Sequence, residues 1–215
     1  MSVTAEQLES PTLALDVERY LAVLQKEAQE RQKFREEIEP HEKAEFINGK
    51  IIMHSPARAK HTEVRSLLER LLGIYVDSTK TGCLVSEKAL CGFTRNDYEP
   101  DIAWFSAEKA AGIEPDTVIF PVPDFIVEVL SPGTSRTDRG VKFIDYAAHG
   151  VDEYWIIDAD SQIVEQYQRE GESYELAAKF AEGTITPLSL PKLHIPHAAI
   201  FDSAANLDCV KSLLS

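Results

Sequence analysis

The first long pattern of polar and apolar positions in the chain predicts a helix over residues 12–38. Val17, Leu21 and Leu24 recur at helical spacing, and the charge-rich sequence QKEAQERQKFREEIE follows them. Pro40 is expected to close this helix, because proline cannot continue a helical hydrogen-bond ladder. Most of the charged positions are interpreted as a solvated face.

The next apolar segments predict a β-hairpin and a second helix. In EFINGKIIM, Asn48 and Gly49 separate two apolar runs, which is the strongest short-range signal for a tight hairpin. Over residues 60–77 a valine and four leucines recur on one face, which predicts an amphipathic helix.

The central part of the chain predicts three strands and a further helix. Alternating and β-branched stretches place the strands at residues 82–93, 101–105 and 124–130. A helix is expected over 136–148, beginning at a Ser or Thr cap and ending at Gly150.

The last third of the chain predicts hairpins. EYWIID and IVEQYQR flank the turn ADSQ, and short strand-like pieces follow between residues 171 and 201. The order helix, three strands, helix, strand indicates an α/β sandwich with a mixed sheet. We assign residues 1–40 to an N-terminal helical extension, 41–205 to one domain and 206–215 to a C-terminal tail.

Composition agrees with one folded domain of 215 residues, since 44% of them are hydrophobic and 27% are charged. No apolar run approaches the roughly 20 residues of a membrane helix, and the first residues lack the features of a signal peptide. We therefore expect no membrane association and a cytoplasmic location. The widely spaced Cys83, Cys91 and Cys209 indicate reduced thiols rather than a disulfide framework or a zinc site.

The net charge restricts the partners. Lys and Arg total 22 against 36 Asp and Glu, a formal charge of −14, which argues against broad binding to polyanions. If nucleic acid is the substrate, a local basic surface or a metal must overcome this charge.

Carboxylates on an apolar strand form the main chemical signal. In PDFIVEVLSP, alternation places Asp124 and Glu128 on the same side of the strand, and Asp101 opens the neighbouring strand in YEPDIAWF. Buried ionised carboxylates are costly unless they are paired, hydrogen-bonded or bound to a metal. Acids from two adjacent strands can converge on one hard cation, and oxygen ligands suit Mg²⁺ or Mn²⁺.

Asp124 has two interpretations. It could be a second carboxylate near the metal, or a residue at the strand entrance that hydrogen-bonds the backbone, which we slightly favour. Strand residues four apart are separated by about 13 Å. This distance favours Asp101 over Asp124 as the partner of Glu128.

The helix after this strand carries a line of polar residues that could partner the carboxylates. Asp138, Lys142 and Tyr146 recur every four residues and can face the carboxylates. A lysine beside a metal and a scissile phosphate could assist the attacking water and offset developing charge. The alternative is a surface pair of Asp138 and Lys142, worth a few tenths of a kcal/mol.

Several segments in order carry a family resemblance. YEPDIAWF, PDFIVEVLSP and TDRGVKFIDYAAHGVDEYWIID resemble the Uma family of predicted endonucleases, a branch of the PD-(D/E)XK restriction-endonuclease-like superfamily. EFINGKIIMHSP, with His61 beyond it, and EGTITPLSLPKLHI extend the resemblance over most of the chain. It implies an αβββαβ nuclease core with a mixed central β-sheet in residues 41–205, here with an N-terminal helix and C-terminal β-hairpins.

The resemblance also implies residue roles. Asp101 is the aspartate of the PD motif and Glu128 the acid of (D/E)XK, both as metal ligands, with the backbone carbonyl of Val129 as a third. Leu130 stands where the motif has lysine, and Lys142 from the following helix is expected to supply the basic group.

Supporting roles fall on five further residues. Glu45, His61 and Glu63 lie in or before the first core helix, where related nucleases sometimes place an additional acid, although for each of them alone we favour a surface or hydrogen-bonding role. Asp138 and Tyr146 are expected to support Lys142.

Cations near the starts of the two core helices could contact DNA. Arg58, Lys60 and Arg65 flank the first start, and Arg136 and Arg139 lie near the second. They could form a basic rim that places phosphates. Scattered solvated cations remain an equal interpretation.

The sequence thus predicts a metal-dependent endonuclease that hydrolyses DNA with Mg²⁺ or Mn²⁺ bound. The N-terminal helix and the C-terminal hairpins could support a homodimer. The alternative is a catalytically inactive nuclease-fold protein that acts as a dimeric binding or scaffolding module.

Overall fold

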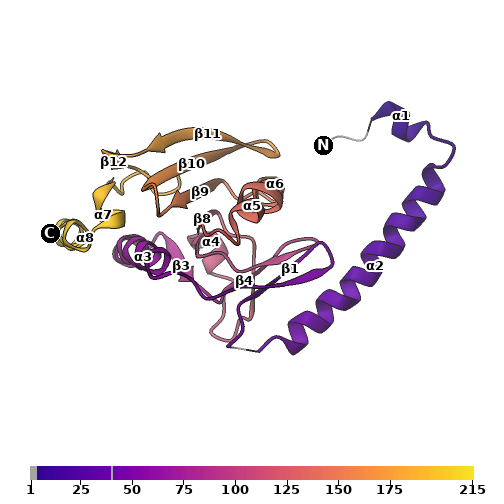
Figure 1. The fold of residues 1–215 in the computed structure, drawn as a ribbon, viewed down its shortest axis with the longest axis horizontal. Coiled ribbons are helices and arrows are strands. Elements are labelled where there is room, and N and C mark those ends of the chain that lie inside the picture. Colours follow the sequence, from indigo (N-terminus) through magenta and orange to yellow (C-terminus); the bar gives the residue numbers. More distant parts are fainter. Residues whose placement is uncertain (1–3, 40) are drawn as a thin grey trace.

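Helices surround a body of β-sheets, and the long helix α2 extends from that body (Figure 1). The structure, a computed structural model, describes residues 4–39 and 41–215, so the predicted helix stop at Pro40 lies outside the described residues. The helices are α1 (Ala5–Leu8), α2 (Leu13–Glu37), α3 (Ala59–Thr79), α4 (Ala107–Ala110), α5 (Ser135–Thr137), a π-helical turn (Asp138–Lys142), α6 (Phe143–Ala148), α7 (Ala198–Phe201) and α8 (Ser203–Leu213).

A six-stranded sheet forms the centre of the molecule. Its order is β11-β10-β9-β8-β6-β3, and β8 pairs parallel with β9 but antiparallel with β6, so the sheet is mixed, as predicted. Its strands are β3 (Gly82–Ser86), β6 (Ile102–Ser106), β8 (Phe125–Val129), β9 (Glu153–Asp158), β10 (Ile163–Glu170) and β11 (Ser173–Phe180).

A second sheet of five short strands has the order β2-β1-β5-β4-β7. The predicted hairpin forms its edge, with Asn48 and Gly49 in the turn at φ values of 49° and 76°, a conformation that Asn and Gly tolerate best. The remaining strands are β1 (Ala44–Ile47), β2 (Lys50–Met53), β4 (Leu90–Gly92), β5 (Asp97–Tyr98), β7 (Ile119–Phe120) and the separate pair β12 (Thr184–Ile185) and β13 (Ile195–Pro196).

Strand β8 supplies side chains to two hydrophobic cores. On one face Phe125 packs in a cluster with Leu68 of α3, and on the other Ile126 packs with Tyr146 of α6. Both faces are therefore covered, which explains why all five residues of β8 are buried. Glu128 lies on the same side of the strand as Ile126.

The predicted strand over 82–93 is wrong as a single element. It is divided into β3 and β4, which belong to different sheets. Glu87 and Lys88 separate them with φ values of 44° and 57°, so the chain turns away from the first sheet there. Neither glutamate nor lysine is typical of a left-handed backbone, so the sequence pattern did not indicate that the strand is interrupted here.

The predicted helix over 136–148 is present but not uniform. Thr134 occupies the N-cap position of α5 without a side-chain cap bond, and His149 precedes Gly150, whose φ is 84°. Between α5 and α6 the backbone widens into the π-helical turn, a feature common at functional sites.

The C-terminal helix α8 was not predicted. Asp202 caps its N-terminus by accepting a hydrogen bond from the backbone N–H of Ala205. Asn206 is fully buried and donates to the backbone carbonyls of Leu67 and Ala199. Most of the segment assigned to a tail therefore packs as a helix against α3.

Among the described residues, no helix combines the length and apolar character needed to cross a membrane.

Candidate active site

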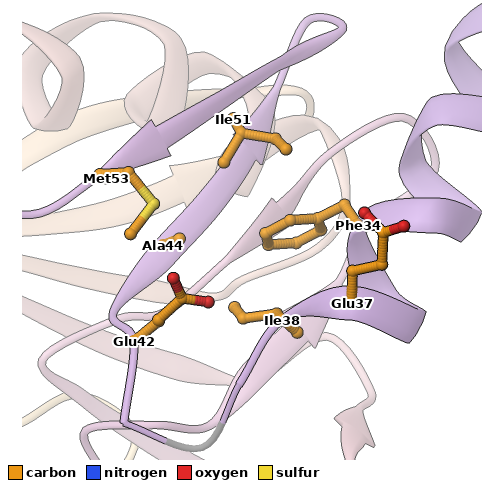
Figure 2. A pocket seen from close by; sticks show the side chains of 7 residues that line it. All are labelled: Phe34, Glu37, Ile38, Glu42, Ala44, Ile51 and Met53. Atoms are coloured by element: carbon orange, nitrogen blue, oxygen red, sulfur yellow. The ribbon is translucent and has the colours of Figure 1, made fainter.

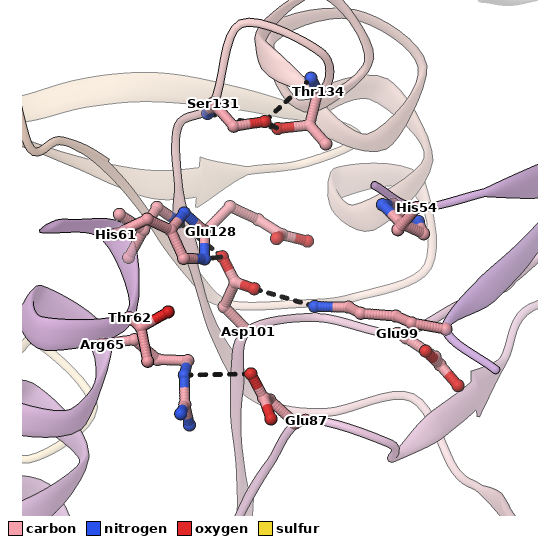
Figure 3. A network of polar contacts seen from close by, with 12 residues as sticks. His54, His61, Thr62, Arg65, Glu87, Glu99, Asp101, Glu128, Ser131 and Thr134 are labelled. Atoms are coloured by element: carbon pink, nitrogen blue, oxygen red, sulfur yellow. Dashed lines mark hydrogen bonds and ion pairs between the residues drawn. The ribbon is translucent and has the colours of Figure 1, made fainter. Parts of the chain in front are cut away.

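Asp101, Glu128 and Lys142 line one cavity of about 640 Å³. Asp101 directly precedes β6 and Glu128 lies near the end of β8, and because these strands are antiparallel neighbours the two acids come to the same edge of the sheet. The π-helical turn brings Lys142 to the same place. Figure 3 shows Asp101 and Glu128 gathered beside His61.

Asp101 is held by three donors. Its carboxylate accepts a 2.9 Å hydrogen bond from the backbone N–H of Val129, and it lies 3.1 Å from Lys43 Nζ and 3.4 Å from His61 Nε2. Burial raises the pKa of Asp101, but the hydrogen bond from His61 and the charge of Lys43 outweigh burial and hold that pKa below its ordinary value. Asp101 is therefore an ionised acid with a fixed orientation.

Glu128 is held by two donors. Its Oε1 accepts hydrogen bonds from Lys142 Nζ at 2.9 Å and from the Tyr146 hydroxyl at 3.0 Å. Burial raises the pKa of Glu128 to about 8, even though Lys142 acts to lower it, and the nearby charges of Asp138 and Asp101 add to the rise. A positive charge added to the cavity would therefore stabilise the ionised form of Glu128.

Lys142 lies among three carboxylates and is only 2% exposed. Its Nζ is 2.8 Å from Glu45 Oε1, 2.9 Å from Glu128 Oε1 and 3.4 Å from Asp138 Oδ1. Burial lowers the pKa of Lys142, but the three acids raise it well above its ordinary value, so the amine stays charged. The alternative of a surface pair between Asp138 and Lys142 is wrong, because both side chains are buried.

Glu45 reaches this site from β1 of the other sheet. Its second oxygen, Oε2, lies 3.1 Å from His54 Nε2, and its Oε1 also accepts the backbone N–H of Glu99 at 3.0 Å. Burial raises the pKa of Glu45, but Lys142 and His54 outweigh burial and lower it. Glu45 thus links the five-stranded sheet to the lysine of the site.

The cavity residues that the sequence did not reveal include Lys43, His54 and Glu99. A signal for two of them was present. The hairpin register pairs Ala44 with Met53, so residues 43 and 54 must lie side by side at its open end. The backbone N–H of His54 indeed donates to the carbonyl of Lys43.

The cavity holds more negative than positive groups. Asp138 Oδ2 and Glu99 Oε2 are buried without a hydrogen-bond partner, whereas Glu45 Oε2 faces His54 and Asp138 Oδ1 faces Lys142. Six acids line the cavity against three lysine or arginine side chains: the acids are Glu45, Glu87, Glu99, Asp101, Glu128 and Asp138, and the cations are Lys43, Arg58 and Lys142. This imbalance favours the entry of a cation.

The donor set fits a small hard cation. Among the residues that the structure describes, no three His, Cys, Asp or Glu side chains stand together so as to enclose an ion. Mg²⁺ does not need such an enclosure, because it is usually held by one or two carboxylates, waters and substrate phosphates. Asp101 and Glu128 provide two carboxylates of this kind in one open cavity.

The remaining candidate acids lie outside the cavity. Asp124 accepts the backbone N–H of Ser106 at 2.7 Å and pairs with Lys109 Nζ at 2.7 Å, which agrees with its structural interpretation at the strand entrance. Glu63 is exposed on α3. Leu130, at the motif position for lysine, packs against the apolar cluster around Tyr146.

The predicted basic rim is dispersed. Arg58 is exposed and lines the cavity, and Arg136 is exposed on α5. The other three pair with carboxylates: Lys60 with Asp160, Arg65 with Glu69 and Glu87, and Arg139 with Glu165. Of the five predicted phosphate contacts, Arg58 is the one that the structure places at the cavity.

Comparisons with known proteins agree with this architecture. A "putative nuclease belonging to DUF820" from Anabaena variabilis has a similar structure, with a TM-score of 0.68 and 25% sequence identity over 81% of this chain and 97% of that one. The uncharacterized protein sll1609 of Synechocystis sp. is 31% identical over 133 residues, which are 61% of this chain and 75% of that protein. The predicted restriction-endonuclease-like α/β fold is therefore confirmed.

The family assignment rests on a longer match. The family model described as "Uma2: Putative restriction endonuclease" matches residues 28–198, which include every acid and lysine of the cavity. The match spans well over half of the chain, and we conclude that this protein belongs to the Uma2 family.

Proposed function

We propose that this protein is a metal-dependent endonuclease that hydrolyses phosphodiester bonds of DNA. Membership of the Uma2 family and the likeness to a nuclease structure support nuclease function. The observation that carries the proposal is the contact of Lys142 with Glu128 inside the cavity that also holds Asp101. Lys142 thus supplies the amino group that Leu130, at the lysine position of the motif, lacks.

Asp101 and Glu128, with the backbone carbonyl of Val129, are the groups that would hold Mg²⁺ or Mn²⁺. Such an ion supplies Lewis-acid polarisation of the phosphoryl group and lowers the pKa of an attacking water. Lys43 and His61 fix the carboxylate of Asp101 for this task, and Tyr146 fixes that of Glu128.

Lys142 has the role of a fixed positive charge. Because the acids around it raise its pKa, it remains an ammonium group and does not act as a general base. An ammonium group beside the scissile phosphate stabilises the negative charge of the transition state and can orient the water by a hydrogen bond. Glu45 and Asp138 hold the amine in place.

DNA would enter the cavity beside Arg58. This exposed guanidinium, together with Arg136, can contact phosphates on either side of the scissile bond. Because a cation that contacts a phosphate releases counterions from the DNA, binding that depends on these contacts should weaken as salt increases.

The test is cleavage of supercoiled and linear DNA with Mg²⁺ or Mn²⁺ present. The parent is expected to cleave, and Asp101→Ala and Glu128→Ala to lose at least about 100-fold in rate. Leu207→Ala, an exposed change on α8, serves as the control. Parental cleavage rates in both acid variants would refute the site. Absence of cleavage by the parent under all metals and substrates would favour the inactive binding or scaffolding module.

A further inference from the structure

The N-terminal half of α2, residues 13–26, is an unusual surface element. Figure 1 shows α2 leading away from the sheets, with its N-terminal part apart from them. Six large apolar side chains in this half are each between 44% and 69% exposed: Leu15, Val17, Tyr20, Leu21, Val23 and Leu24. The other half of α2 buries Phe34, which is the one buried residue of this helix.

The C-terminal half of α2 anchors the helix to the body. Arg31 and Arg35 both bind the carboxylate of Asp97, at 2.5 and 2.6 Å, and Glu27 pairs with Arg95 at 2.7 Å. The N-terminal half is therefore held in a set direction. A helix of this length without tertiary packing is only marginally stable in water, so its apolar side requires a covering surface.

A complementary groove lies at the other end of the same helix. A cavity of about 250 Å³ separates the last turn of α2 from the β1–β2 hairpin (Figure 2). Ile51 and Met53 of the edge strand β2 are 54% and 57% exposed. The lining residues are Phe34, Glu37, Ile38, Glu42, Ala44, Ile51 and Met53.

The charge of the free half of α2 is compatible with binding to a second copy of this chain. The free half of α2 carries Asp16, Glu18, Arg19 and Lys26, a formal charge of zero, whereas the chain as a whole carries −14. This half can therefore approach another acidic copy without net repulsion. Arg19 pairs with Asp16 and Lys26 with Glu30 on the same helix, but exposed pairs of this kind are weak. Both cations can therefore turn to the acids Glu37 and Glu42 of the groove, which is apolar elsewhere.

We propose that the groove binds the free half of α2 from a second copy of this chain, and that the exchange is reciprocal. A two-fold axis makes both contacts identical and buries both apolar surfaces in a closed dimer. This proposal does not depend on the proposed function.

The dimer would place α2 of each copy next to the candidate active-site cavity of the other copy. Met53 lines the groove and also the cavity that contains Asp101 and Glu128. The partner helix would thus cover the hairpin at one side of the cavity, and a dimer would carry two such cavities.

Sedimentation velocity of the full chain tests the proposal. The parent is expected to be a dimer, and two double variants are expected to be monomers: Leu21→Gln/Leu24→Gln in the helix and Ile51→Gln/Met53→Gln in the groove. The matched control, Leu207→Gln/Leu214→Gln, changes two exposed leucines at α8 and should remain dimeric. Unchanged near-ultraviolet circular dichroism and a single cooperative thermal transition would show that the body of each variant is folded, while the thermal midpoint itself is expected to fall when the dimer is lost.

Mixing the two monomeric variants gives a second readout. The helix variant retains an intact groove and the groove variant an intact helix, so the mixture should regain dimers held by one intact contact. A monomeric parent, a dimeric helix variant or a dimeric groove variant would each overturn the proposal. Failure of the mixture to form any dimer would overturn the reciprocal helix-in-groove arrangement.

Discussion

Lys142 Nζ lies 2.9 Å from Glu128 Oε1, although the two residues are 14 positions apart in the chain. Two positions after Glu128, where the motif places lysine, Leu130 packs into an apolar cluster instead. The π-helical turn ends at Lys142 and aims its amine back at the end of β8. The positive group is thus supplied by a different element while its contact with the acid is kept.

Replacement of the buried lysine should affect both stability and cleavage. Lys142→Met removes the cation shared by Glu45, Glu128 and Asp138, so we expect the free energy of unfolding to fall by about 3 kcal/mol at pH 8. Cleavage should fall at least about 100-fold. Urea unfolding and DNA cleavage measure the two effects.

The control for this change is Lys109→Met, which also removes a lysine from a carboxylate. Lys109 pairs with Asp124 outside the cavity, so cleavage should persist in this variant. Equal cleavage by the parent and Lys142→Met would show that the amine has no role in the reaction.

Stability without divalent ions should decrease as pH rises. Burial raises the pKa of Glu128 to about 8, above the ordinary 4.5. Between these values the folded protein keeps a proton that the unfolded chain has released. This stabilising contribution is full below pH 4.5 and is lost as pH rises through 8.

We expect the free energy of unfolding to fall by roughly 2–4 kcal/mol between pH 5 and pH 9. Glu128→Gln should flatten this dependence, because the amide does not titrate. Chemical denaturation of both proteins at intervals of pH provides the measurement. A slope that is unchanged in Glu128→Gln would assign the titration to another group.

Divalent ions should stabilise the folded protein through Asp101. Mg²⁺ or Mn²⁺ binds the native site, so the thermal midpoint should rise with ion concentration and fall back on chelation. Asp101→Asn should abolish this rise, whereas Asp124→Asn should retain it because Asp124 bonds to Ser106 and Lys109 instead. A persistent rise in Asp101→Asn would place the ion elsewhere.

The anchor of α2 should depend on a single buried carboxylate. Asp97 is fully buried and receives both Arg31 and Arg35, so Asp97→Asn should lower the free energy of unfolding by about 3 kcal/mol at pH 7. Burial raises the pKa of Asp97, but its hydrogen bonds with the two arginines outweigh burial and lower it.

The sign of this second pH dependence is opposite to that of Glu128. A lowered pKa gives stability that is present above pH 3.8 and is lost as pH falls below that value. The difference between Asp97→Asn and the parent should therefore shrink in acid. Denaturation curves at pH 7 and in acid test this, and a constant difference would contradict it.

Local patterns in the sequence determined the elements that carry the site. The Asn48-Gly49 turn, the apolar face of α3 and the alternation of β8 are visible because strands repeat every two residues and helices every 3.6. The pairing of β6 with β8 then followed from their order. For this reason the approach of Asp101 to Glu128 could be expected before the structure was known.

Only the tertiary structure decided what surrounds these acids. Glu45 meets Lys142 because two sheets pack together, and the turn at Glu87 and Lys88 that separates β3 from β4 has no local signal. The burial of Lys142 likewise depends on acids that are distant in sequence. Periodicity encodes which face of an element is apolar, but contacts between elements arise from the packing of the whole chain.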